Sequence, residues 1–178
     1  MSLMNRFWIS GALAAAALTA LSPAALGQTS ALKGLNTDAP VDVAADRIEV
    51  LDKADRAIFS GNVIVRQADL TLTAARLTVA YSNNGSLQIQ RLDASGGVTV
   101  KSPSETAKGQ FGIYDLDRKI ITLIGGVTLV RGDSRVNGGR LVIDLDSGRA
   151  VVEGGGPPGV NQGGGRVTGT FTVPKKNG

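Results

Sequence analysis

The feature that most constrains this chain is a glycine corner that recurs inside runs of alternating residues. A Gly-Asn or Gly-Gly step followed by mostly β-branched residues occupies residues 61–65, 96–100 and 125–129, and Gly154-Gly155-Gly156 echoes it. Glycine adopts backbone angles that valine cannot, so this step inside a strand permits a bulge or a sharp bend. Bends that recur at one level of every repeat would fold each hairpin over itself and produce two facing antiparallel sheets.

The segments between the corners alternate between apolar and polar residues with period two, and helical spacing is absent. A second repeated mark is an Arg-aliphatic-x-aliphatic run at residues 47–50, 76–79 and 140–143, with residues 110–113 in the third slot. Turn signals separate the runs, the strongest being Asn84-Gly85, which is typical of a type I′ hairpin. These patterns predict an all-β protein, an open antiparallel β-jelly roll built from about four repeated hairpin units.

The two ends of the chain differ in composition from its middle. Asn5-Arg6, the apolar run 7–21 and the small residues 25–27 have the pattern of a cleavable signal peptide, too short for a membrane-spanning helix. We therefore expect a signal peptide over 1–27, a mature protein that starts at Gln28 and a flexible segment over 28–38. The jelly roll is expected over 39–153. Residues 154–178 form a Gly-rich segment, with a last edge strand where residues 166–173 alternate.

Composition excludes several classes of function. The chain has no Cys and no His, so Ser-His-Asp or Cys-His catalysis and His- or Cys-ligated metal sites are excluded. Nineteen basic against fifteen acidic residues give a mild positive charge, and the few aromatic residues are not interleaved with the basic ones, which argues against nucleic-acid binding. We expect no enzyme activity, no cofactor and no metal.

Two pairs of carboxylates are candidate catalytic groups. Asp115 and Asp117, like Asp144 and Asp146, lie two residues apart and would share one face of a strand. Both pairs, however, occupy the place in the repeat where a hairpin must turn, and Asp is favoured there because its side chain bonds to nearby backbone N–H groups. We interpret them as turn residues, with catalysis or calcium binding as the alternatives.

Residues 39–153 resemble a known family, the periplasmic lipopolysaccharide-transport proteins of the LptA type, also called OstA-like. The closest passages are 40–46, 59–65 and 70–77, together with the recurring Gly-Gly-Val corners. The resemblance implies a periplasmic bridge component that carries lipopolysaccharide from the inner to the outer membrane. It also implies an inner-membrane LptC-like partner and an outer-membrane LptD-like partner. Separately, the unpaired first and last strands of an open jelly roll predict head-to-tail self-association through the sheet edges. The Gly-rich stretch before the last strand departs from the family pattern.

Given this resemblance, we interpret the aliphatic residues on one face of the strands as a candidate lipid-binding groove. From strand parity, its expected inward-facing residues are Val41, Val43, Ile48, Val50, Val63, Val65, Leu77, Val79, Val98, Val100, Phe111, Ile113, Val127, Leu129, Leu141 and Ile143. Tyr114 is expected to face away from the groove. The alternative to a lipid carrier is an exported structural or adhesive β-repeat protein with a packed core and no ligand. Arg47, Arg76 and Arg140 are expected to point outward, either solvated beside acidic residues or in contact with lipid phosphates.

Overall fold

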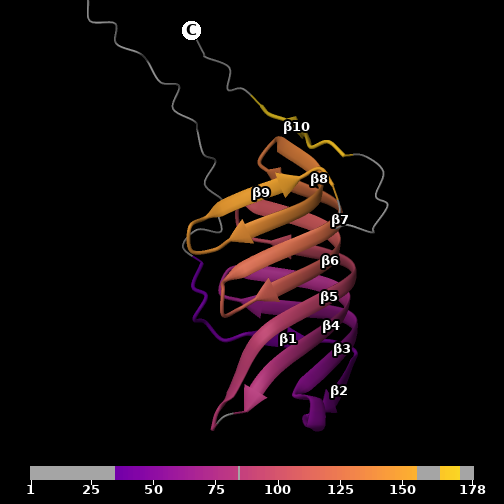
Figure 1. Ribbon diagram of the computed structural model, residues 1–178, viewed down its shortest axis with the longest axis vertical. Helices are drawn as coiled ribbons and strands as arrows, with labels where there is room; N and C mark the ends of the chain where they lie inside the picture. Colours follow the sequence, from indigo (N-terminus) through magenta and orange to yellow (C-terminus); the bar gives the residue numbers. More distant parts are fainter. Residues whose placement is uncertain (1–34, 84, 156–164, 173–178) are drawn as a thin grey trace, which may run out of the picture.

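The computed structural model describes residues 35–83, 85–155 and 165–172, and the expected signal peptide lies outside them. The described residues form a single antiparallel sheet of ten strands and one 3-10 turn. In chain order these are β1 (Asp42–Ala44), β2 (Arg47–Leu51), η1 (Asp52–Ala54), β3 (Arg56–Gln67), β4 (Leu70–Asn83), β5 (Leu87–Lys101), β6 (Glu105–Asp115), β7 (Ile120–Arg131), β8 (Ser134–Asp144), β9 (Arg149–Glu153) and β10 (Thr168–Thr170). The fold is the open antiparallel β-jelly roll that the repeat predicts (Figure 1).

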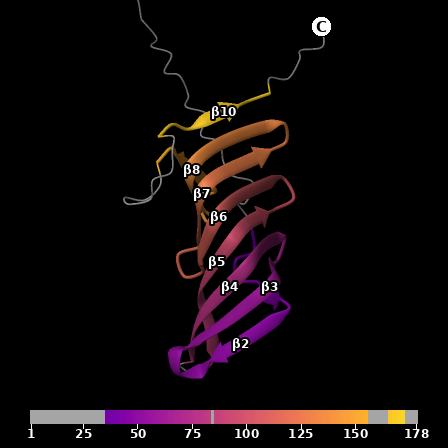
Figure 2. The same ribbon diagram turned by 90° about the vertical axis from the view of Figure 1, so that its right-hand side faces the viewer.

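The long strands β3–β8 each bend once, so the sheet folds into two facing leaves (Figure 2). Leaf A contains β1, β10 and the segments of β3–β8 that meet at the turns 67–70, 101–105 and 131–134. Leaf B contains β2, β9 and the segments that meet at the turns 83–87, 115–120 and 144–149. The leaves are joined along the line of bends, and their turns form two rims along the opposite, open side.

The bends lie at the predicted glycine corners. The strand register shifts between Ser60 and Val63, between Ser95 and Val98 and between Ile124 and Val127, so the glycine-bearing strand has an extra residue at each corner. Gly96 and Gly97 have φ of 82° and 85°, a region that L-residues rarely adopt. A Cβ on Gly96 would lie 2.7 Å from the Cβ of Ala75 in β4, so this corner also needs glycine for close packing.

The hairpin turns use the Asp side chains as expected. The backbone N–H of Arg118 donates to Oδ1 of Asp115, and that of Ser147 donates to Oδ1 of Asp144, both at 2.9 Å. The hydrogen bond from Ser147 is the main reason that the pKa of Asp144 is lowered. Asp115 and Asp144 therefore close hairpins, which is the structural role that the sequence favoured over catalysis.

The last strand of the roll is interrupted at its corner. Strand β9 pairs with the leaf B part of β8, and β10 pairs with the leaf A part of the same strand. A Cβ on Gly154 would lie 2.5 Å from the backbone O of Gly165, so the chain leaves β9 and returns toward β10 at nearly the same point. β9 and β10 thus correspond to one bent strand, with Gly154 and Gly165 at the place of its glycine corner.

Candidate functional site

The inner faces of the two leaves form rows of apolar residues that run from one end of the roll to the other. In leaf A, cross-strand partners give the row Val43, Val65, Leu72, Val100, Ala107, Leu129, Val136 and Gly169. In leaf B, they give the row Ile48, Phe59, Leu77, Ala94, Gly112, Leu123, Leu141 and Val152. Residues that pair across antiparallel strands share a face, so each row lies on one face of its leaf. Neither row contains a charged or polar side chain.

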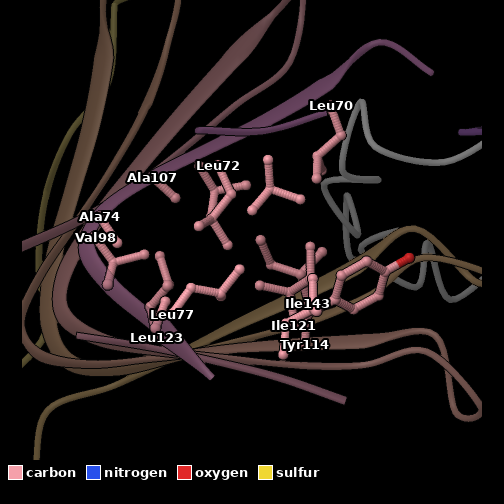
Figure 3. Packing of buried hydrophobic residues seen from close by; sticks show 14 of the residues in the cluster. Leu70, Leu72, Ala74, Leu77, Val98, Ala107, Tyr114, Ile121, Leu123 and Ile143 are labelled. Atoms are coloured by element: carbon pink, nitrogen blue, oxygen red, sulfur yellow. The ribbon is translucent and has the colours of Figure 1, made fainter. Parts of the chain in front are cut away.

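The middle of this interior is filled by its own side chains. Leu77, Leu123 and Leu141 have no exposed surface, and they belong to one continuous core cluster. Figure 3 shows Ala74 and Val98 near the bend and Leu70 and Tyr114 toward the open side, with the other side chains of the cluster between the leaves. A ligand that entered between the leaves in this region would have to separate them.

Both ends of the interior are open. At the β2 end, Ile48 and Val50 lie opposite Phe59 and Ala57 and share their inner face, yet they are 55% and 54% exposed. At the β10 end, Phe171 is 55% exposed and lines a cavity of about 460 Å³. The other residues that line this cavity are Leu129, Arg131, Ser134, Val136, Ala150 and Val152. Inner-face apolar residues are therefore accessible at each end of the roll.

Most of the predicted groove residues lie on the inner face. Nine are buried: Val63, Val65, Leu77, Val79, Val98, Val100, Val127, Leu141 and Ile143. Val41, Val43 and Leu129 are half-buried and pack against the core. Ile48 and Val50 share the inner face but are exposed at the end of the roll.

The expected inward orientation is wrong for Phe111 and Ile113. Phe111 pairs with Ser95 and Ile124 on the outer face and is 55% exposed, whereas Tyr114 is 2% exposed and faces the core. The error is a shift of one residue in the repeat. Phe111, and not Gln110, occupies the slot of Arg76 and Arg140, so the inner positions that follow are Gly112 and Tyr114. A one-residue slip exchanges the two faces of a strand.

Several inner residues were missed by the sequence reasoning. The buried positions absent from the predicted groove include Leu70, Leu72, Leu92, Ala94, Ala107, Ile121 and Leu123. The alternation at Leu70-Thr71-Leu72 was a sufficient signal for the first two. Residues 120–124 are apolar at almost every position, so alternation alone could not tell which of them face inward.

The three arginines of the repeat point outward, as expected. Arg47, Ser60 and Arg76 are neighbours across the outer face of leaf B. Arg47 lies 3.8 Å from Glu49, and Arg140 lies 3.4 Å from Glu153, both as solvent-exposed ion pairs. Exposed pairs of this kind contribute little to stability.

Two buried polar side chains meet at the open side of the roll. The hydroxyl of Tyr114 donates to Oε1 of Gln67 at 2.8 Å, which joins leaf B to leaf A. Burial raises the pKa of Tyr114 to about 12, so its hydroxyl stays protonated and remains a donor at neutral pH. At another turn of the leaf A rim, Arg131 pairs with the buried Glu105.

In the described ranges, no group of three or more acidic side chains is arranged to hold a metal ion. In the same part of the chain, no helix is long and apolar enough to cross a membrane.

Comparison with known proteins places these features in a family context. The family described as "LptA/(LptD N-terminal domain) LPS transport protein" matches residues 42–149. An uncharacterized protein of Rhizobium meliloti (strain 1021) is 36% identical over 160 residues, which cover 83% of this chain and 86% of that protein. The LPS-assembly protein LptD of Yersinia enterocolitica is 35% identical over 82 residues, which cover 45% of this chain but 10% of LptD.

The fold is also that of a solved structure. LptH of Pseudomonas aeruginosa, described as the LptA-homologous periplasmic component of the lipopolysaccharide transport device, superposes with a TM-score of 0.69. The match covers 77% of this chain and 98% of LptH, at 19% sequence identity.

Proposed function

This chain belongs to the LptA/LptD N-terminal domain family of lipopolysaccharide-transport proteins, and on that premise we propose that it is a periplasmic carrier of lipopolysaccharide. The observation that carries the proposal is the pair of apolar rows that run along the interior, with an exposed apolar side chain at each end of the roll, Ile48 at the β2 end and Phe171 at the β10 end. The acyl chains of lipid A would lie between the leaves along these rows.

The expected affinity needs no catalytic or polar site. Each methylene that leaves water for an apolar interior contributes about 0.8 kcal/mol, so several acyl chains suffice for stable binding. The protein would act by contact alone, without a chemical step.

The partners proposed are proteins of the same fold. Strands β1 and β10 each pair on one side only, and an unpaired edge accepts a strand from another chain by β-augmentation. Because the two edges differ, the contact is heterologous and continues as an open chain of domains. An LptC-like domain would join one end and an LptD-like domain the other, so that lipid moves from the inner to the outer membrane. Export by the signal peptide would place the mature protein, beginning at Gln28, in the periplasm, and its intact mass checks this start.

A pair of phenylalanines with opposite orientations provides the test. Phe59 pairs with Leu77 and packs against the core, whereas Phe111 lies on the outer face. A photo-reactive phenylalanine analogue at position 59 should capture lipopolysaccharide in cells, and the same analogue at position 111 should not. Equal capture at the two positions would contradict binding between the leaves.

The second candidate function is a structural or adhesive β-repeat protein without a ligand. The filled middle of the core favours it, since a packed interior needs no lipid. Mass spectrometry of protein purified from a Gram-negative host separates the two: co-purifying lipopolysaccharide supports the carrier, and protein free of lipid supports the structural role.

A further inference from the structure

Entry of a ligand between the leaves from the side, and not from an end, requires the two rims of the open side to part, and Gln67 links these rims. Gln67 lies at the leaf A rim, at the end of β3, and is 1% exposed. Its Oε1 accepts the hydrogen bond from Tyr114, which comes from leaf B. Figure 3 places Tyr114 on the open side, far from the bend at Ala74 and Val98.

The same glutamine also binds the segment that precedes β1. We call residues 35–40 the strap. The Nε2 of Gln67 donates to the backbone O of Thr37 at 2.8 Å and to that of Ala39 at 3.0 Å. The Gln67 amide therefore uses both of its N–H donors on the strap and its carbonyl on Tyr114, so loss of one partner affects the others.

The strap is a compact turn anchored at one end to the interior. Asn36 accepts two hydrogen bonds: its Oδ1 from the N–H of Asp38 and its backbone O from the N–H of Ala39, each at 3.2 Å. Leu35 packs against the core cluster. The strap is therefore held at its first residue by Leu35 and further along by its bonds to Gln67.

An opening lies between the strap and the leaf B rim. A cavity of about 560 Å³ is lined on one side by Thr37, Asp38 and Ala39, with Gln67 at its wall. Its other side is lined by residues of leaf B, including Leu87, Ile89 and Leu116. Among the described residues, the hydrogen bonds that join the strap to the rims are the two from Gln67.

We propose that Gln67 and Tyr114 form a latch that holds the strap across the open side of the roll, and that release of the latch opens a side entry for acyl chains. The inference rests on the proposed function, because it assigns how that ligand reaches the interior. The latch slows both entry and exit of the lipid.

The test removes one hydroxyl and keeps the ring. Tyr114→Phe leaves the packing in place but deprives Gln67 of its donor, and Tyr81→Phe is the matched control because Tyr81 takes no part in the latch. We expect amide hydrogen exchange at residues 36–41 to rise about fivefold in Tyr114→Phe, the value for loss of one neutral hydrogen bond. The control should exchange like the wild type.

The second measurement follows ligand entry by stopped-flow fluorescence with two probes, a fluorescent long-chain fatty acid and fluorescently labelled lipopolysaccharide. Association and dissociation rates of both probes should rise several-fold in Tyr114→Phe. If Tyr114→Phe fails to fold by circular dichroism, Asn36→Ala replaces it, because this exposed change weakens the strap turn without touching the interior. Unchanged exchange in the strap, or unchanged rates when both probes bind, overturns the latch.

The two probes separate this inference from the proposed function. If lipopolysaccharide binds to neither protein while the fatty acid enters faster in the variant, the carrier function is wrong and the latch stands. If both probes bind at equal rates in the two proteins, the latch is wrong and the carrier function stands. If neither probe binds, both are wrong.

Discussion

At the scale of single residues, Tyr114 differs most in chemistry from the buried side chains around it, because it carries a hydroxyl. Among the described residues that are buried and hydrophobic it is the one aromatic residue, the others being Val, Leu, Ile and Ala, and it is 2% exposed. A buried hydroxyl is tolerated only when it is hydrogen-bonded, and Gln67 supplies the acceptor. One residue thus combines a packing role with the link between the leaves.

The raised pKa of Tyr114 predicts how stability depends on alkaline pH. Its ordinary pKa is 10.0 and its folded pKa is about 12, so between these values the folded protein retains a proton that the unfolded chain has lost. Stability should therefore be constant through pH 9 as far as this group is concerned. It should then fall by up to about 1.4 kcal/mol per pH unit above pH 10.

Urea unfolding at pH 8 to 11.5, followed by circular dichroism, measures this effect. Tyr114→Phe should lose stability at pH 8, by about 1 kcal/mol for the missing hydrogen bond, but should lack the extra alkaline decline. Tyr81→Phe should keep the decline that Tyr114 causes. Parallel pH profiles for the wild type and Tyr114→Phe would show that Tyr114 is not buried as described.

At the scale of the elements, the glycine corners lie where the sheet bends, with the extra residue of each corner in β3, β5 or β7. Gly96 and Gly97 are neighbours with the same left-handed backbone, but their surroundings differ. A Cβ on Gly96 would lie 2.7 Å from Ala75, whereas a Cβ on Gly97 would meet nothing within 4 Å. The two positions therefore separate backbone strain from steric overlap.

Substitution of each glycine by alanine should resolve the two contributions. Gly97→Ala should cost about 1–2 kcal/mol of unfolding free energy, the cost of a left-handed residue with a Cβ. Gly96→Ala should cost at least about 1 kcal/mol more, because the neighbouring strand must also move. Urea titration of both variants gives the difference, and equal costs would mean that the corner does not need the close approach of β4.

At the scale of the whole molecule, the interior of the roll is filled by its own side chains along the middle, whereas apolar side chains of the inner face are exposed at the ends. Ile48 and Phe111 are equally exposed, at 55% each. Ile48, however, lies on the inner face at the β2 end, whereas Phe111 lies on the outer face of a central strand. If the ends join, Ile48 becomes buried in the contact and Phe111 stays in water.

This pair of residues predicts the effect of an added charge on assembly. Ile48→Lys should weaken self-association or partner binding by at least tenfold, because it places an ammonium group in an apolar contact. Phe111→Lys should leave association unchanged and serves as the control. Sedimentation velocity over a range of concentrations measures both. Association that is equal in the two variants would exclude the end-to-end contact.

The family match supports this view of the ends. It joins LptA with the N-terminal domain of LptD, and the Yersinia enterocolitica LptD matches this chain over 82 residues. A domain of the same fold on another protein would present the same pair of leaves. If such a domain joined this chain end to end, as proposed, its inner rows would continue those of this chain.

The sequence by itself determined what depends on neighbours along the chain. Alternation predicted strands, Gly-Gly steps predicted the corners, and Asp115 and Asp144 predicted hairpin turns, because each is set by local backbone geometry. The tertiary structure alone decided what depends on distant strands. The position of the bend in β6 sets which parity faces inward: Ala107 is buried before it and Tyr114 after it, which is why the expected orientations of Phe111 and Tyr114 are exchanged. The position of β2 at the end of the sheet left Ile48 and Val50 exposed, since no further strand covers them. The hydrogen bond between Tyr114 and Gln67 requires the two leaves to face each other, and no local pattern in the sequence indicates that contact.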